Sequence, residues 1–289
     1  HVSVLKNGTD ATLTDGVSGT ISMETSSKIN ETFKGSLGLN FIDASGFADI
    51  PLSEKSSLQF AGRKSISDFT ETPTYTNFFE RISQGTEVET NANDILNSDQ
   101  EFDFYDTSLR WIYNISHKEQ LQVNFLTVNN ELRFNENSMM DGQERSRQSS
   151  LSQNSMAGAL HYKRVWNDTW QTTFEAYETD YELKAINANL LDQQRFQQEN
   201  AVSETSLKFL VNYKLNERLQ FLNGYHFVET QIRNLDDVDN PRFRSLISEV
   251  LRTHGLFSQL NYSSLDKRTS LNFGLRYNYL DKFEKHILE

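Results

Sequence analysis

Apolar and polar residues alternate along most of the chain with the period of two that is typical of β-strands. In the segment 271–279, for example, Leu271 and Phe273 alternate with Asn272 and Gly274. Because successive side chains of a strand point to opposite faces, one face of this strand is apolar and the other is polar or small. The same alternation occurs in the segments 33–41, 109–115, 156–163 and 207–215.

The pattern predicts about eleven strands: 32–42, 46–52, 56–66, 104–116, 121–134, 152–165, 170–185, 202–215, 219–232, 250–265 and 268–280. Short polar clusters such as Asn167-Asp168 separate the strands of successive pairs, as in tight hairpin turns. All neighbouring strands are therefore expected to pair antiparallel. Within 121–134 the apolar positions change phase after Phe125, which predicts either a bulge or a strand that leaves the membrane for water.

The connections between these strands are short on one side and long on the other, as in 67–103 and 135–151. Outer-membrane β-barrels have short periplasmic turns, long extracellular loops, and strands with an apolar outer and a polar inner face. Their aromatic girdles are matched by Trp166 and Trp170, which flank one turn. A soluble β-sandwich would also alternate, but its strands and loops are shorter. The sequence therefore favours an all-β, antiparallel transmembrane β-barrel.

Composition limits the alternatives. The 289 residues are 36% hydrophobic and 12% aromatic, so the chain has rings to bury and is not disordered. No apolar run approaches the roughly 20 residues of a transmembrane helix. The net charge of -12 argues against a nucleic-acid partner, and the absence of Cys excludes disulfides and thiolate metal sites. The chain has neither an initiator Met nor a signal peptide, so we expect it to be part of a longer protein.

The sequence contains no convincing catalytic constellation. Its six His residues lack metal-site spacing, there is no Gly-x-Ser-x-Gly elbow, and no carboxylate pair stands out. We therefore expect no enzyme activity, no cofactor and no metal site. One segment, with Asp236, Asp237 and Asp239, offers oxygen ligands of the kind that Ca²⁺ binds, although it lacks the Gly and distal Glu of an EF-hand.

The first long connection is the best candidate for ligand contacts. Residues 67–101 hold eight acidic residues and one basic residue, which is also typical of a solvated acidic loop. The same segment contains Tyr75, Phe78, Phe79 and Arg81, and exposed rings beside polar groups suit stacking on sugars or flat ligands. We therefore expect these four residues to bind substrate.

The stretch 14–25 (TDGVSGTISMET), with its turn at Gly16 and Gly19, resembles the end of the plug domain in TonB-dependent outer-membrane transporters. The short first hairpin that follows, the third strand ending at 61–65, and the closing segment 274–279 are also similar to this family. The resemblance covers essentially the whole chain. It implies a plug end at 1–30 and the N-terminal half of the barrel at 31–289, with about half of the 22 strands of such a barrel.

The resemblance implies a receptor in the outer membrane of a Gram-negative cell, which imports a bulky nutrient such as a siderophore or glycan with energy from the TonB complex. Its partners would be TonB, reached through the missing start of the plug, outer-membrane lipid, the extracellular nutrient and, in some members, a surface lipoprotein. The Asn-, Phe- and Tyr-rich composition is similar to that of Bacteroidetes transporters. The alternative function is an unplugged porin or adhesin-type barrel without energy coupling.

Overall fold

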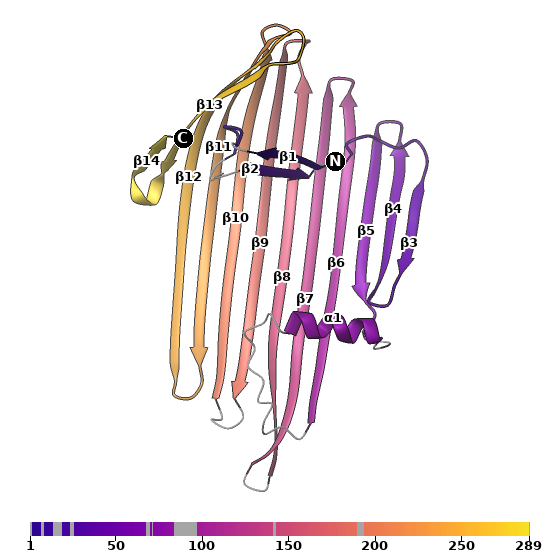
Figure 1. Cartoon of the computed structure of the whole chain (residues 1–289), viewed down its shortest axis with the longest axis vertical. Helices are drawn as coiled ribbons and strands as arrows, with labels where there is room; N and C mark the ends of the chain where they lie inside the picture. Colours follow the sequence, from indigo (N-terminus) through magenta and orange to yellow (C-terminus); the bar gives the residue numbers. More distant parts are fainter. Residues whose placement is uncertain are drawn as a thin grey trace.

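The computed structural model describes residues 2–6, 9–13, 19–23, 26–67, 70, 72–83, 97–140, 143–189 and 194–288. These residues are almost entirely β-strand, with one α-helix, α1 (Pro73–Ser83), and one 3-10 turn, η1 (Asp281–Phe283). Figure 1 shows a large sheet with a small separate hairpin and α1 in front of it. None of the described helices is long and apolar enough to cross a membrane.

Twelve strands form one antiparallel sheet in which each strand pairs with its neighbours along the chain, from β3 at one edge to β14 at the other. They are β3 (Lys34–Leu39), β4 (Asp43–Ser53), β5 (Ser56–Ser65), β6 (Asn97–Ser116), β7 (Glu119–Met140), β8 (Gln143–Val165), β9 (Trp170–Asn189), β10 (Gln194–Lys214), β11 (Leu219–Val238), β12 (Phe243–Ser263), β13 (Ser270–Leu280) and β14 (Lys285–Leu288). Each of the eleven predicted strands is present, and β14 is an additional one. The sheet does not close on itself within the described residues.

In the alternating segments, the apolar side chains lie on the convex face of this sheet, as the alternation predicts. In β13, Phe273 is 72% exposed, whereas Arg276 and Asn278 on the opposite face are each 2% exposed. The register continues the apolar face across the sheet, because Phe273 pairs with Leu260 and Leu260 with Phe221. The convex face therefore carries a continuous apolar band, which is the face expected to meet lipid.

The long strands β6 to β12 continue beyond the apolar band at the end opposite the short turns. β8 has 23 residues and β7 has 22, whereas about 9–11 residues suffice to cross a bilayer. The expectation of a long loop at 135–151 is wrong, because these residues belong mainly to a β7–β8 hairpin. The strands predicted from 104–116 to 250–265 are too short at this end because, beyond the band, the outward face becomes mostly polar and the regular alternation stops.

The phase change in β7 has a simple structural cause. The β6–β7 register is continuous along β7, and the irregularity of this pair lies instead at Asn114 and Ser116. A bulge is therefore not the explanation. After Phe125 the convex face turns polar, while Leu132 and Phe134 are buried on the concave face against α1. The alternative prediction, a strand that leaves the apolar band for water, fits this arrangement.

Aromatic rings on the convex face gather near the short turns. Trp111 and Tyr113 stack with their ring centroids 5.6 Å apart, and Trp170 lies 4.5 Å from Tyr213. Such rings place an apolar body beside a polar tip, which suits the boundary between an apolar layer and water. The arrangement has the form of the expected aromatic girdle.

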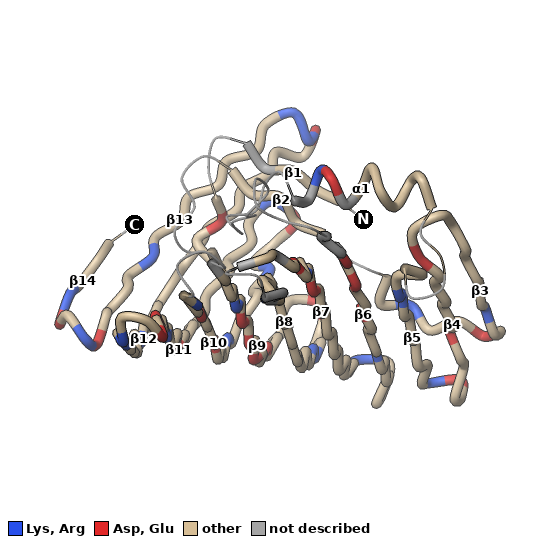
Figure 2. The backbone as a smooth tube through the Cα atoms, turned by 90° about the horizontal axis from the view of Figure 1, so that it is seen from below, with Lys and Arg blue, Asp and Glu red and all other residues tan. Residues whose placement is uncertain are grey.

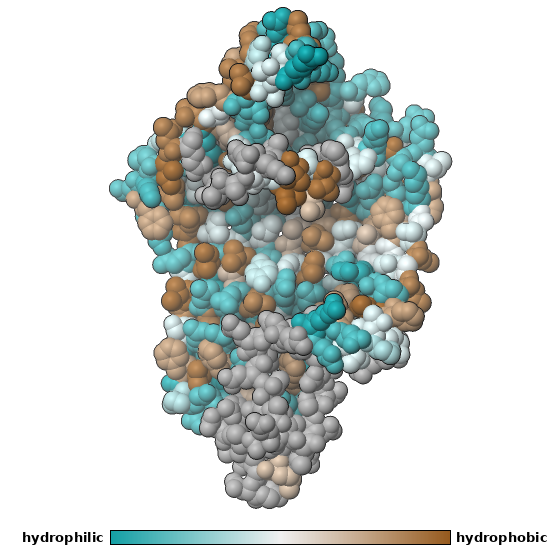
Figure 3. Space-filling view, in the orientation of Figure 1, coloured by the Kyte–Doolittle hydropathy of each residue, from teal (hydrophilic) through white to brown (hydrophobic). Residues whose placement is uncertain are grey.

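The sheet is curved, and its concave side holds the remaining elements (Figure 2). A hairpin of β1 (Val2–Lys6) and β2 (Gly19–Met23) forms its own two-stranded sheet near the end with the short turns, and α1 lies nearer the opposite end. Figure 3 shows the molecule from the concave side, and here polar residues lie among apolar ones across the strands. The concave face therefore combines polar side chains of the strands with the N-terminal hairpin and α1, and it is the face on which we look for a functional site.

Candidate functional site: the concave face of the sheet

A row of basic and polar side chains crosses the concave face on four neighbouring strands. Lys208 of β10 pairs with His226 of β11, His226 pairs with Gly255 of β12, and Gly255 pairs with Asn278 of β13. Arg276 lies two residues before Asn278 and on the same face. Because the chain as a whole carries a net charge of -12, this basic row is a local feature of the wall.

Gly255 makes room for the side chain of Arg276. A Cβ atom on Gly255 would lie 2.4 Å from Nη2 of Arg276 and 2.9 Å from Oδ1 of Asn278. Arg276 donates from Nε to Asn278 Oδ1 at 2.9 Å and from Nη2 to Nδ1 of His226 at 3.2 Å. A guanidinium can only donate, so Nδ1 accepts and the Nε2–H of His226 donates to the Ser206 hydroxyl at 3.0 Å. His226 is therefore neutral in this arrangement.

The same strands hold the N-terminal segment. Arg276 donates from Nη1 to the carbonyl of Ala11 at 3.2 Å. Gln259 accepts from the backbone N–H of Ala11 at 2.8 Å and donates to the carboxylate of Asp10 at 3.0 Å. Gly274 lies beneath, where an added Cβ would be 2.9 Å from the Cβ of Ala11. We call Gln259, Gly274 and Arg276 the wall anchor.

A second attachment lies on strands farther along the concavity. Arg110 of β6 donates to the carbonyl of Ser26 at 3.3 Å, and Gln120 of β7 donates to the carbonyl of Ser27 at 3.2 Å. β2 falls between these two attachments in sequence, and the first attachment, at Asp10 and Ala11, lies between β1 and β2. The N-terminal segment therefore crosses the concave face and is held on both sides, largely through its backbone carbonyls.

At the other end of the sheet, α1 is held by an apolar cluster. Tyr75 is 3% exposed and packs with Phe102, Phe104, Leu132 and Phe134 of β6 and β7. Burial of one such side chain contributes about 1.5–3 kcal/mol, so the cluster is the main attachment of α1 to the wall.

Side chains near α1 also replace a missing strand. β5 pairs with β6 only as far as Tyr105, so in the described part of the chain the backbone of β6 before that residue has no strand partner on that side. The Tyr75 hydroxyl donates to the carbonyl of Phe102 at 2.9 Å and accepts from its N–H at 2.7 Å. Ser65 accepts from the N–H of Phe104 at 3.2 Å. These contacts satisfy backbone groups that would be costly to bury unpaired.

The predicted ligand residues are only partly brought together. Tyr75 is buried, so it is not the exposed stacking ring that the sequence analysis expected, because its hydroxyl is needed by the backbone of β6. Phe78 is 38% exposed and lies 6.0 Å from the ring of Phe102. Arg81 is exposed in the last turn of α1, and the side chain of Phe79 lies outside the described residues. The binding role of these residues stays a prediction.

Of the two glycines of the predicted plug-end turn, Gly16 lies outside the described residues. Gly19 is the first residue of β2 and pairs with Lys6 of β1. The predicted turn itself is therefore not described, whereas the strand that follows it is.

The segment proposed as the one calcium candidate does not form a ligand cluster. Asp236 and Asp237 are adjacent on β11 and so point to opposite faces. Asp237 lies 3.9 Å from Arg244, and Asp239 accepts from the backbone N–H of Arg195 at 2.7 Å. In the described part of the chain, no group of three or more acidic or His side chains could hold a metal ion.

Beyond the apolar band, the convex face carries ion pairs. Arg133 of β7 lies 2.6 Å from Glu131 and 3.2 Å from Glu101 of β6. The hydrogen bond from Arg133 holds the pKa of Glu131 below its ordinary value, and the same bond raises the pKa of Arg133. Charged side chains on this face are compatible with water and not with a lipid interior.

Sequence reasoning missed the wall anchor. Gln259, Gly274 and Arg276 look like ordinary polar-face residues of two strands, and their common partner is about 250 positions earlier in the chain. The one available signal was glycine at inward positions of β12 and β13, because an inward Gly indicates that another group approaches the backbone closely.

Known structures share this architecture, although no protein family model and no curated protein matches the sequence. A mutant of the ferric enterobactin receptor PfeA from Pseudomonas aeruginosa is similar over 89% of this chain, with a TM-score of 0.52 and 14% identity. Over the aligned part, the chain shares the antiparallel β-sheet fold of this receptor. The ferric-catecholate import receptor Fiu from E. coli K12, in its open form, aligns over 93% of the chain with a TM-score of 0.46 and 7% identity. The chain spans 39% of the length of the first protein and 58% of the second.

Proposed function

We propose that this chain is part of an outer-membrane receptor that imports a bulky nutrient with energy from the TonB complex. The observation that carries the proposal is the N-terminal segment fixed across the concave face, through Ala11 on one side and Ser26 on the other. A barrel whose lumen is occupied in this way needs an energy source to let a large ligand pass. Residues 1–30 are then the end of a plug, and residues 31–289 are part of the barrel wall.

The apolar band supports placement in the outer membrane. Its side chains are large, exposed and continuous across the convex face, as Phe273 and Leu37 illustrate with 72% and 93% exposure. Monomeric soluble proteins rarely expose apolar patches of this extent. The long polar extensions of β6 to β12 then project outside the cell, and the short turns face the periplasm.

In this arrangement α1 lies on the lumen wall at the extracellular end, where an arriving ligand first meets the wall. The ligand class we propose is a siderophore, glycan or similar compound with flat or ring-shaped groups. Phe78 offers a partly exposed ring and Arg81 a cation on the same helix. The receptor of similar fold is described as a ferric enterobactin receptor, which is compatible with a ligand of this kind.

The test is ligand uptake by cells that express the full-length protein, with and without functional TonB. We expect uptake that requires TonB and that falls in the double variant Phe78→Ala, Arg81→Ala. The matched control is Phe243→Ala, Arg244→Ala, which removes the same residue types from the start of β12. Uptake that persists without TonB would favour the unplugged barrel, and equal uptake by both double variants would remove α1 from the binding site.

A further inference from the structure

The convex face carries a groove that neither the apolar band nor the concave site explains. Eight of its lining residues form a grid of two rows on four strands. Asp180 of β9 pairs with Met156 of β8 and Ser203 of β10, and Ser203 pairs with Gln231 of β11. The second row, one step farther from the band, is Asn154, Glu182, Ala201 and Arg233.

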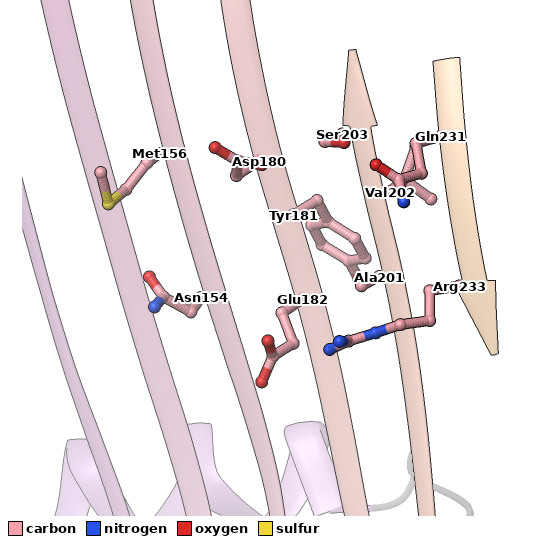
Figure 4. A pocket seen from close by; sticks show the side chains of 10 residues that line it. All are labelled: Asn154, Met156, Asp180, Tyr181, Glu182, Ala201, Val202, Ser203, Gln231 and Arg233. Carbon is pink, nitrogen blue, oxygen red and sulfur yellow. The ribbon is translucent and has the colours of Figure 1, made fainter. Parts of the chain in front are cut away.

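The groove exists because β10 carries small side chains between larger ones. Ser203 and Ala201 form the floor, with the carboxylates of β9 on one side and Arg233 of β11 on the other (Figure 4). Its volume is about 280 Å³. Strands lie about 4.8 Å apart, so the walls are about 10 Å from each other, and two residues along a strand span about 7 Å. One six-membered sugar ring fits a hollow of this size.

The groove begins where the apolar band ends. On β9 the outward residues change from Phe174 and Ala176 to Glu178 and Asp180, within two to four positions. Asp180 lies four residues beyond Ala176, and four residues of a strand correspond to about 13 Å, so the groove lies beyond the last apolar side chains, within reach of an extended sugar headgroup. In the membrane placement proposed above, on which this inference rests, the groove faces the headgroups of the outer leaflet.

We propose that this groove binds a sugar residue in the headgroup of an outer-leaflet glycolipid. A sugar ring presents hydroxyls that both donate and accept in all directions. The groove matches it with carboxylate acceptors on β9, amides of Asn154 and Gln231 that do both, the hydroxyl of Ser203 and the apolar surface of Met156. The lipid anchor keeps the sugar at high local concentration, so a shallow groove suffices.

The charges favour a sugar over a phosphate. Arg233 is the one basic residue that lines the groove, and its guanidinium is already paired with Glu199. Asp180 and Glu182 form no ion pair with any residue that the structure describes. Two such carboxylates repel a phosphate and accept hydrogen bonds from hydroxyls. They would also accept an amine headgroup, which the experiment has to separate.

The experiment measures lipid retained by the full-length protein after reconstitution in nanodiscs and native mass spectrometry. The probes are lipopolysaccharide, its dephosphorylated form, its deacylated oligosaccharide and phosphatidylethanolamine. We expect retention of both acylated sugar lipids and weak binding of the free oligosaccharide. The variant Ser203→Leu, which fills the floor without changing charge, should lower retention about tenfold or more.

The matched control is Ser150→Leu, an outward position of β8 beyond the groove, and it should retain lipid like the wild type. The proposal is overturned if Ser203→Leu also retains lipid, if dephosphorylation abolishes binding, or if phosphatidylethanolamine binds as well as the glycolipids. Uptake by cells with the wild-type protein separates this result from the proposed function. If the wild-type protein retains the glycolipids but imports no ligand, the transport role alone is contradicted. If it imports ligand but retains no glycolipid, the glycolipid site alone is contradicted.

Discussion

The hydrogen bonds of the Tyr75 hydroxyl predict how much α1's attachment to the sheet weakens when that hydroxyl is removed. The change Tyr75→Phe removes only the hydroxyl and keeps the ring in the apolar cluster. It deletes the hydrogen bonds of 2.9 Å and 2.7 Å to Phe102. The carbonyl of Phe102 still accepts from Ser67 at 3.1 Å, but its N–H loses the hydroxyl as acceptor.

A buried donor without a partner costs about 1–3 kcal/mol. That cost falls on the contact between α1 and β6, while the strand pairing elsewhere in the sheet is unchanged. Since 1.4 kcal/mol is a factor of ten, local opening of α1 should become roughly 5 to 150 times more frequent. The global stability of a barrel with strands of 20 or more residues should change far less.

Hydrogen exchange followed by mass spectrometry, on the full-length protein in detergent, measures this opening directly. Peptides that cover 73–83 should exchange faster in Tyr75→Phe, with no change in peptides from β9 to β12. The control is Tyr105→Phe, which removes a hydroxyl from the outward face of β6, where Tyr105 is 43% exposed. Equal exchange of 73–83 in wild type and Tyr75→Phe would refute the assignment of α1's attachment to this hydroxyl.

Three further predictions test other parts of the structure. Phe273→Arg should make the free energy of folding into bilayers less favourable by about 2–4 kcal/mol, whereas Asn272→Arg should have little effect, as measured by denaturant titration in liposomes. The reverse order would mean that the faces are assigned wrongly. Ala11→Cys with Gly274→Cys should form a disulfide without reductant, seen as a gel-mobility shift, since the chain has no other Cys. Because the pKa of Glu131 is lowered, its stabilising contribution is fully present above the ordinary Glu pKa and should be lost as the pH falls through the lowered pKa of the folded state. Hydrogen exchange of peptides from β6 and β7, followed as the pH is lowered, can check this.

The period of two was sufficient to predict the sheet and its two faces. A strand that is apolar on one side, such as 271–279, admits one assignment of faces, because a shift by one residue would expose every polar side chain to the apolar environment. The order and antiparallel pairing followed from the short turns. These features depend on neighbours in sequence, and they are the features that the alternation records.

The strand ends and the concave site could not be obtained in the same way. Residues 135–140 and 143–151 pair through their backbones, and their sequence shows no regular alternation of apolar and polar positions. The burial of Tyr75 depends on where β5 ends, because only an unpaired stretch of β6 gives its hydroxyl a partner. Both facts depend on pairings between distant segments that local patterns do not contain.

The β12–β13 pair shows how one stretch of wall serves two environments. Outward residues such as Leu256 and Phe273 form the apolar band, while the residues between them anchor Ala11. Because successive side chains of a strand point to opposite faces, a residue either faces the apolar band or contacts the N-terminal segment. The wall anchor is therefore assembled from inward positions on both strands. Glycines at two of these positions, Gly255 and Gly274, bring Arg276 and Ala11 close to the backbone without altering the outward face. Substitutions at these glycines should therefore affect the N-terminal segment while the apolar band remains intact, which separates the function of the lumen from insertion into the membrane.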